Sequence, residues 1–161
     1  MSKHVVQLVD SRNMGGIETH ILQLAAGLIR HKVNCTVVFL NDYGPHDLEA
    51  LLANQQIPFL KLTGGVVGRV SALKSLKPNV IQTHGYKAGI LGRCVAFGLN
   101  VRCVSTFHAG EEKTGRMKYY DILDRWTAGL AQARFCVSDA VLKGLPVKAE
   151  VLANFVGVPS L

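Results

Sequence analysis

The sequence predicts an α/β fold, a Rossmann-like parallel β-sheet with helices on both faces. Short runs rich in β-branched residues alternate with longer segments of helical period along the chain. The strand-like runs are too apolar to have one face in water, which is typical of strands covered on both sides. The 161 residues, 48% of them hydrophobic, are enough for a single well-buried domain and too few for two ordinary ones.

Taken in order, seven strand-like runs alternate with six helix-like segments. The first helix has the clearest period, because its apolar residues recur on one stripe: Ile17, Ile21, Leu24, Ala25 and Leu28. Pro45 fits the first turn of the second helix, and Ser138 is suited to cap the last one. The strands are expected at His4–Val9, Val33–Leu40, Ile57–Leu62, Asn79–Thr83, Val101–Thr106, Arg134–Val137 and Glu150–Ala153, and the helices at Ile17–His31, Pro45–Gln55, Gly68–Leu76, Lys87–Phe97, Gly115–Ala131 and Asp139–Leu145.

The net charge of +7 comes from one part of the chain. Residues 61–102 carry seven Lys/Arg and no Asp/Glu, whereas the segments on either side are nearly balanced. These residues either form a solvated basic surface or attract an anionic substrate, an anionic membrane or nucleic acid. Nucleic acid is the least supported partner, because no recognition motif or interleaved aromatic residues accompany the charges. The seven are Lys61, Arg69, Lys74, Lys77, Lys87, Arg93 and Arg102.

The four cysteines, Cys35, Cys94, Cys103 and Cys136, are far apart and embedded in apolar stretches. This pattern favours buried free thiols over disulfides or a metal site. No apolar run approaches the 18 residues that a membrane span requires, and no signal peptide is evident. A cytoplasmic protein without a bound metal or cofactor is therefore the expectation.

In a doubly wound parallel sheet, ligands bind at the carboxyl ends of the strands. The loop after the first strand holds Gly15-Gly16 directly before a helix. Glycines can adopt positive φ and let a ligand approach the backbone. Because the helix that follows also offers free N–H groups, the ligand expected here is a phosphate. A plain tight turn is the alternative, because neither the dinucleotide fingerprint nor a P-loop is present.

Two further loops place a histidine at a carboxyl end. His84 is followed by Gly85 and Lys87, and His108 precedes a polar stretch that contains Glu111. Histidines at these places could hydrogen-bond sugar hydroxyls, or stabilise a phosphate when protonated. The stretch after His108 is either an ordinary exposed loop or a mobile flap over an acceptor. A metal site is not predicted, because no third ligand has evident spacing.

Five segments in order resemble the N-terminal domain of GT-B glycosyltransferases, in particular the large family 4 of retaining, nucleotide-sugar-dependent enzymes. They are GGIETHILQLAAGL, VIQTHGYKAGILGR, VSTFHAGEE, YYDILDRWTAGLAQARFCVSDAV and VLANFVGVP. The resemblance runs from about residue 4 to the end of the sequence. It implies that residues 1–161 form a single Rossmann-like acceptor-side domain, and that the nucleotide-sugar-binding second domain of such enzymes lies outside this chain.

The resemblance also assigns roles to the loop residues. His108 matches a histidine that reaches the transferred sugar, and Gly15 and Gly16 contact the donor's diphosphate or sugar. Arg12 and Glu18 are added to the donor group by their proximity to the glycines. The acceptor group comprises His84, Gly85, Lys87 and Glu111.

The whole enzyme is thus expected to transfer a sugar from a nucleotide-sugar to a glycan or lipid-linked acceptor in surface polysaccharide or lipopolysaccharide biosynthesis. It is expected in the cytoplasm, with peripheral contact to an anionic membrane, and this chain alone is expected to be inactive. Two alternatives remain open. One is a non-catalytic module that binds a glycan or a protein, and the other is half of a nucleotide-sugar epimerase.

Overall fold

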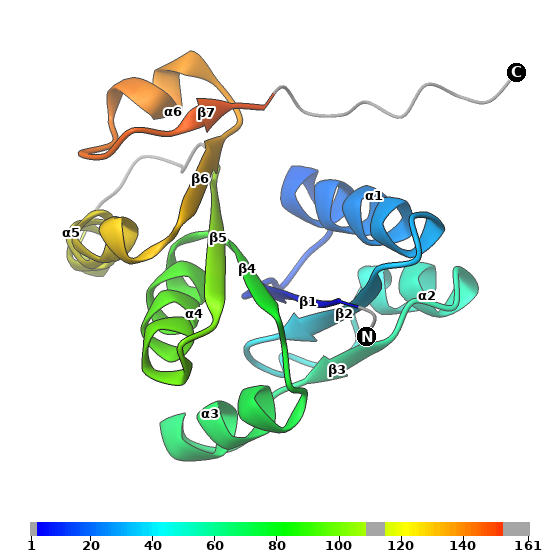
Figure 1. Cartoon of the computed structure of the whole chain (residues 1–161). Helices are drawn as coiled ribbons and strands as arrows, with labels where there is room; N and C mark the ends of the chain where they lie inside the picture. The colour runs from blue at the N-terminus through cyan, green and yellow to red at the C-terminus, as the bar shows by residue number, and fades with distance from the viewer. Residues whose placement is uncertain (1–2, 109–114, 153–161) are drawn as a thin grey trace, which may run out of the picture.

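The computed structural model describes residues 3–108 and 115–152 and shows a seven-stranded sheet (Figure 1). The strand order is β3-β2-β1-β4-β5-β6-β7, and every neighbouring pair is parallel. This confirms the predicted α/β fold class and its parallel sheet. The strands are β1 (His4–Val9), β2 (Asn34–Phe39), β3 (Phe59–Lys61), β4 (Val80–His84), β5 (Arg102–Phe107), β6 (Ala133–Cys136) and β7 (Glu150–Val151).

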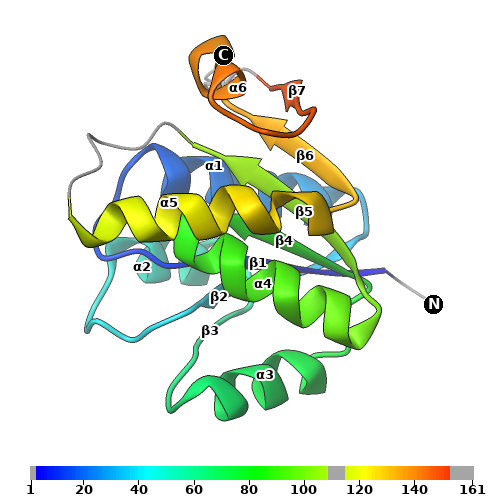
Figure 2. The same ribbon diagram turned by 90° about the vertical axis from the view of Figure 1, so that its left-hand side faces the viewer.

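Helices cover both faces of this sheet, as Figures 1 and 2 show from two directions. Helices α1 and α2 pack on one face, α3 and α4 pack on the other, and α5 lies against α4. The helices are α1 (Gly16–Arg30), α2 (Asp47–Asn54), α3 (Val66–Ser75), α4 (Tyr86–Leu99), α5 (Arg116–Thr127) and α6 (Asp139–Lys143), with a short 3₁₀ turn, η1 (Ala128–Leu130), after α5.

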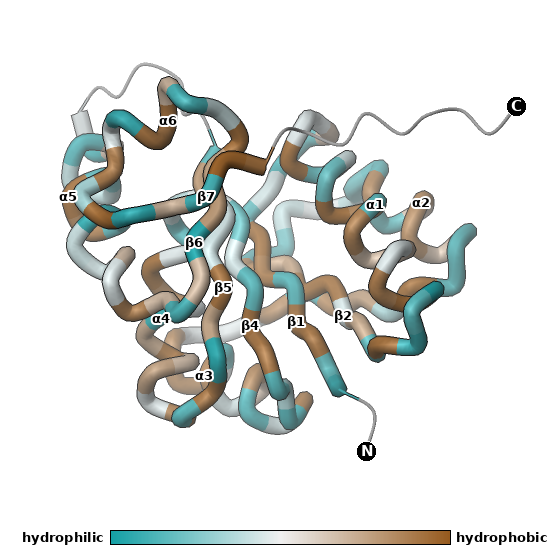
Figure 3. The backbone as a smooth tube through the Cα atoms, turned by 45° about the horizontal axis from the view of Figure 1, so that its top comes forward, coloured by the Kyte–Doolittle hydropathy of each residue, from teal (hydrophilic) through white to brown (hydrophobic). Residues whose placement is uncertain are grey.

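Successive residues of the central strands point into two separate apolar cores. Val9 and Val37 join Ile21 of α1 on one face, whereas Leu8 and Ile81 pack on the opposite face, towards α3 and α4. All five of these side chains are 1% exposed or less. Figure 3 shows hydrophobic colour along parts of the central strands β1 and β4. Burial on both faces explains why these strands lack the alternation of a half-exposed sheet.

The chain reverses its direction of winding between β1 and β4. The connection after β1 leads to α1 on one face, and the connection after β4 leads to α4 on the other. Because β1 and β4 are neighbours in the sheet, the two connections diverge at the carboxyl ends of these strands, which in open α/β sheets is where a crevice forms. Ligands of open α/β sheets bind at such a switch point, and both the glycine pair and His84 lie beside it.

Two local expectations about the helices meet different outcomes. Ser138 caps α6, because its hydroxyl accepts a hydrogen bond from the Val141 backbone N–H. Pro45 is not in the first turn of α2, which begins at Asp47, so that expectation was wrong. His46 caps this helix instead, with its imidazole accepting from the Leu48 N–H. A histidine is not among the usual capping residues, and the sequence pattern therefore placed the start too early.

Packing of α4 against the sheet depends on small residues. A Cβ added to Gly92 would lie 2.4 Å from the Thr83 methyl carbon and 3.1 Å from a Leu8 methyl carbon. Such distances are well inside van der Waals contact, so any side chain at residue 92 would push α4 off the sheet. The residues one turn to either side, Ala88 and Ala96, are also small and fully buried.

The basic segment 61–102 does not form one solvated surface. Arg93 is 1% exposed and pairs with Asp124 of α5 at 2.5 Å, while Lys61 pairs with Asp42 and Glu49. The two interpretations left open for this segment, a solvated basic surface and attraction of an anionic partner, therefore apply to fewer than seven cations. Arg93 was counted as a surface charge because arginine is rarely fully buried unless it is paired, and its acidic partner lies far along the sequence.

The cysteine prediction is correct for three of the four residues. All four thiols are free, and Cys35, Cys103 and Cys136 are buried. Burial raises the pKa of Cys103 to about 11, so this thiol is inert at neutral pH. Cys94 is exposed instead, because it lies on α4 next to the inward-facing Arg93 and therefore on a different side of the helix.

No helix within residues 3–108 and 115–152 combines the length and the apolar character needed to cross a membrane.

Candidate functional site

The loop that contains Gly15 and Gly16 enters α1 without using the positive φ that glycine permits. Gly15 is the N-cap of α1 with φ −165°, which any residue can adopt, and Gly16 is not among the positive-φ residues. What constrains Gly15 is Glu18, whose Oε2 would lie 3.2 Å from an added Cβ. The Glu18 carboxylate thus lies over the start of α1, where the helix dipole stabilises negative charge.

The loop after β4 does require its glycine. Gly85 has φ +81° and ψ 169°, a combination that is essentially restricted to glycine. This conformation turns the chain directly from His84, the last residue of β4, into Tyr86, the first residue of α4. The first N–H groups of α4 therefore face the same crevice as the start of α1.

Three histidines meet at the crevice. The ring centroid of His84 lies 5.7 Å from that of His20 and 5.9 Å from that of His108, and the centroids of His20 and His108 are 5.9 Å apart. They come from three elements, since His20 is on α1, His84 ends β4 and His108 follows β5. His84 and His20 are buried, at 1% and 7% exposed.

The histidine cluster is neutral at physiological pH. Burial lowers the pKa of His108 to about 4, with a smaller contribution from His20. Burial also lowers the pKa of His84 well below its ordinary value and that of His20 below it. Neutral imidazoles hydrogen-bond hydroxyl groups and do not attract phosphate as cations do. The lowered pKa values are thus more consistent with contact to hydroxyls than with attraction of a phosphate, and both roles stay predictions.

A network of polar side chains fixes the loops around the cluster. Asp10, just after β1, accepts hydrogen bonds from Asn41 at 2.8 Å and Tyr43 at 3.3 Å, and pairs with Lys87 at 3.2 Å. Burial of Lys87 opposes its charged form, but the hydrogen bond and attraction of Asp10 outweigh it and raise the pKa of Lys87. Arg12 stacks over the Tyr43 ring at 4.2 Å.

The structure thus brings most of the predicted site residues to one edge of the sheet. Gly15, Gly16 and Glu18 lie at the start of α1, and Gly85 and Lys87 lie at the start of α4. His84 and His108 are in ring contact, although the burial of His84 leaves it no free surface. Glu111 lies outside the described residues. The ligand roles of all these residues stay predictions.

Sequence reasoning missed His20. It lies three residues after Ile17 and one before Ile21, on the apolar stripe of α1. A polar residue at the N-terminal end of such a stripe faces the carboxyl edge of the sheet, and this was the available signal. Within the described residues, no group of three or more His, Cys, Asp or Glu side chains is arranged to hold a metal ion.

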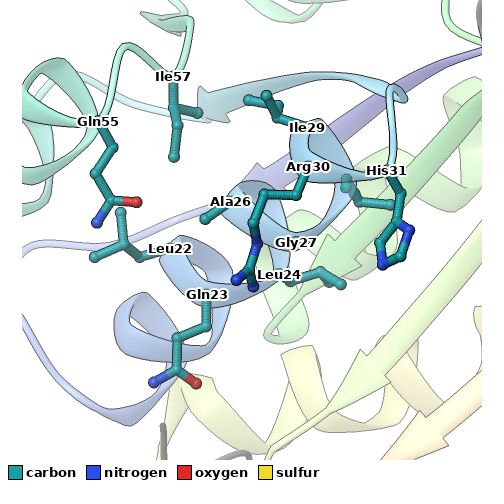
Figure 4. Close-up of a pocket in the computed structure, with 11 residues that line it drawn as sticks. Leu22, Gln23, Leu24, Ala26, Gly27, Ile29, Arg30, His31, Gln55 and Ile57 are labelled. Atoms are coloured by element: carbon teal, nitrogen blue, oxygen red, sulfur yellow. The ribbon is translucent and has the colours of Figure 1, made fainter. Parts of the chain in front are cut away.

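A groove also lies elsewhere on the molecule. A groove of about 1020 Å³ follows the C-terminal part of α1 and the end of α2, where it is lined by residues such as Leu22, Ala26, Arg30 and Gln55 (Figure 4). It lies at the opposite end of α1 from Gly15 and Gly16. The groove is therefore separate from the histidine cluster, and its size alone does not make it the site.

Comparison with solved structures identifies the architecture. Anabaena Alr3699/HepE in complex with UDP has a TM-score of 0.78 and 17% identity, over 94% of this chain and 44% of that one. Acinetobacter baumannii MurG has a TM-score of 0.67 and 16% identity, over 94% and 45%. A UDP-N-acetylglucosamine 2-epimerase has a TM-score of 0.63 and 15% identity, over 95% and 48%. The chain therefore spans a little under half the length of each of these proteins.

At these identities the solved structures establish the fold, which is that of the N-terminal half of GT-B glycosyltransferases. No curated protein sequence matches the chain significantly. The sequence model for Glycosyltransferase Family 4, however, matches residues 14–147. This range contains the glycine loop and all three clustered histidines. The chain belongs to glycosyltransferase family 4 and has the fold of its N-terminal domain.

Proposed function

We propose that this chain is the acceptor-side half of a retaining glycosyltransferase. The whole enzyme would transfer a hexosyl or related sugar from a nucleotide-sugar to a glycan or lipid-linked acceptor in surface polysaccharide or lipopolysaccharide biosynthesis, in the cytoplasm. The observation that carries the proposal is the neutral cluster of His20, His84 and His108 at the switch point of a family 4 fold. Without the second domain, the chain itself is inactive.

In this proposal the donor approaches the start of α1. The solved structures of Alr3699/HepE include complexes with UDP and with UDP-glucose, which supports a nucleotide-sugar as the donor class here. Gly15 and Gly16 leave the helix N-terminus open to the diphosphate. The Glu18 carboxylate lies beside Gly15, so it must turn away from a bound diphosphate or bind a sugar hydroxyl next to it. Arg12, exposed and close by, supplies positive charge.

The acceptor lies on the α4 side of the same crevice. Lys87 and Gly85 stand at the start of α4, and Glu111 belongs to the chain that follows His108. His108, half-buried and neutral, hydrogen-bonds a hydroxyl of the transferred sugar. Its imidazole orients that sugar between donor and acceptor and does not act as a proton donor at neutral pH, since its pKa is about 4. No metal or cofactor is assigned to this half.

The proposal is tested by incubating the two-domain protein with nucleotide-sugars, with and without candidate acceptors. We expect the sugar to be transferred only when an acceptor is present. Conversion of the nucleotide-sugar to an epimer without any acceptor would identify an epimerase instead. Binding of a glycan without any turnover of a nucleotide-sugar would identify a non-catalytic module.

Contact with an anionic membrane belongs to this proposal, and α5 is the surface that supports it. Tyr119, Ile122, Leu123 and Trp126 recur at helical spacing on one side of α5 and are 45–85% exposed. Arg116, Lys118 and Arg125 lie on the same helix. Exposed apolar and aromatic side chains beside cations are typical of helices that lie in the membrane interface.

Trp126→Ser is expected to weaken binding to phosphatidylglycerol vesicles about tenfold or more, because burying a large apolar side chain contributes roughly 1.5–3 kcal/mol. Co-sedimentation with vesicles measures this. Val67→Ser on α3 is the matched control, since Val67 is 84% exposed and belongs to another helix. Equal losses in both variants, or no binding by the unchanged protein, would rule out α5 as the contact.

A further inference from the structure

Gln7 is a polar residue at the centre of an apolar strand. It is 0% exposed, with Val6 and Leu8 on either side at 0%. In the parallel ladder His84 is the register partner of Val9, and Gln7 precedes Val9 by two residues. Side chains two residues apart on a strand share a face, so Gln7 lies on the same face of the sheet as His84. The buried side chain of Gln7 therefore has a polar partner nearby.

The hydrogen bonds of Gln7 fix the proton on His84. The side-chain amide N–H of Gln7 donates to Cys35 Sγ at 3.3 Å, and its carbonyl oxygen, Oε1, faces His84 Nε2 at 3.1 Å. A carbonyl oxygen can only accept, so Nε2 of His84 carries the hydrogen. The other ring nitrogen, Nδ1, is then a bare acceptor. It is buried and has no hydrogen-bond partner.

His20 is the third residue of the histidine cluster. Its ring meets the rings of both His84 and His108 edge-on, with interplanar angles of 62° and 73°. It is buried on α1, and the packing of that helix therefore sets where His108 can lie. Like His84 Nδ1, the Nε2 atom of His108 is buried without a partner. Buried polar groups without a partner are destabilising, and each one in a native structure calls for an explanation such as a role in binding or catalysis.

We propose that Gln7 and His20 are positioning residues of the site. Gln7 holds the proton on Nε2 of His84, so that Nδ1 faces the cluster as an acceptor, and His20 keeps the His108 ring in one orientation beside it. Cys35, Gln7 and His84 thus form a hydrogen-bonded chain from the interior of the sheet to the site. The consequence for transfer rests on the proposed function, whereas the proton position and the ring packing do not.

The proton position is measured by nitrogen-15 NMR of the histidine rings in this chain. The unchanged protein is expected to show His84 as the Nε2–H tautomer alone. Gln7→Leu removes the acceptor, and the His84 signals should shift to those of a mixture of both tautomers. The matched control is Gln82→Leu, because Gln82 is the register partner of Gln7 on β4 but donates to Thr106 at 3.3 Å. That variant should leave the His84 signals unchanged.

The packing by His20 is tested with two variants in the same experiment. His20→Ala opens the cluster to water and should raise the pKa of His108 from about 4 towards its ordinary value. His20→Phe keeps a ring in place and should preserve most of the lowering of the His108 pKa. A general loss of stability would not distinguish the two variants in this way. In the two-domain protein, Gln7→Leu should lower kcat about 10- to 100-fold with the donor KM unchanged, because a small displacement of the groups that position the substrate slows the reaction without weakening donor binding.

Two results would overturn the proposal. The first is an Nδ1–H tautomer of His84 in the unchanged protein, which needs no variant to fold. The second is a His108 pKa that responds equally to His20→Ala and His20→Phe. If the two-domain protein transfers no sugar at all, the proposed function fails, and the ring signals still decide whether Gln7 and His20 position the cluster.

Discussion

His108→Ala in the two-domain protein is expected to lower the turnover of sugar transfer by about 10²- to 10³-fold, the usual loss when one preorganised hydrogen-bonding group is removed from a site. His108 lies at the carboxyl end of β5, half-buried, and in ring contact with His20 and His84. In the proposed function, its neutral imidazole holds the sugar that is transferred. Initial rates with saturating donor and acceptor measure the effect.

The fold should survive this change, because His108 belongs to the connection after β5 and not to either of the two cores on the sheet faces. Circular dichroism and the unfolding midpoint in urea check this. His31→Ala is the control, since His31 is an exposed histidine at the end of α1. Turnover of His108→Ala equal to that of the unchanged protein would remove His108 from the site.

Asp124→Ala is expected to lower the free energy of unfolding by about 3–5 kcal/mol, because it leaves a buried arginine without its counter-charge. Arg93 donates to the Asp124 carboxylate at 2.5 Å and to the Asp124 backbone carbonyl at 2.9 Å. It also donates to Thr127 at 2.8 Å and Ser105 at 3.1 Å. This one side chain therefore joins α4 to α5 and β5. Urea denaturation of the chain measures the loss.

The matched control for this prediction is Asp121→Ala, one turn earlier on α5. Asp121 pairs with Arg125 at 2.9 Å in an i,i+4 arrangement whose arginine side chain is 43% exposed, and such surface pairs contribute only about 0.3–0.5 kcal/mol. Replacing both charged residues by apolar ones, as in Arg93→Met with Asp124→Leu, should recover most of the lost free energy of unfolding. Similar losses in Asp124→Ala and Asp121→Ala would contradict the account of the buried pair.

Much of the fold was predictable because the helical period of the apolar residues and the hydrophobicity of the strands agree with the tertiary structure. The expected range of the first strand, His4–Val9, coincides with β1, and the rule that ligand loops follow parallel strands correctly brought His84 and His108 together. What local sequence could not reveal depends on distant partners. Arg93 is buried with Asp124 as its counter-charge, and Gln7 is buried with His84 and Cys35 as its hydrogen-bond partners.

The glycines illustrate the same limit. Gly15 and Gly16 were singled out because glycine can adopt positive φ, yet it is Gly85 that has it, at +81°. Gly15 and Gly16 lead into α1 through an extended backbone at Gly15. The chain after His84, in contrast, must turn at once into α4. Both loops contain glycine before a helix, and only the direction in which the helix leaves the sheet distinguishes them. That direction is set by the order of the strands, which the sequence pattern did not determine.

In the proposed function, this fold carries one half of a retaining sugar-transfer site. The most direct test of this proposal is proton NMR of the product formed by the two-domain protein from a nucleotide-sugar and an acceptor. The account predicts a glycoside with the anomeric configuration of the donor, formed only in the presence of the acceptor. A product of inverted configuration, or an epimerised nucleotide-sugar formed without the acceptor, would contradict it.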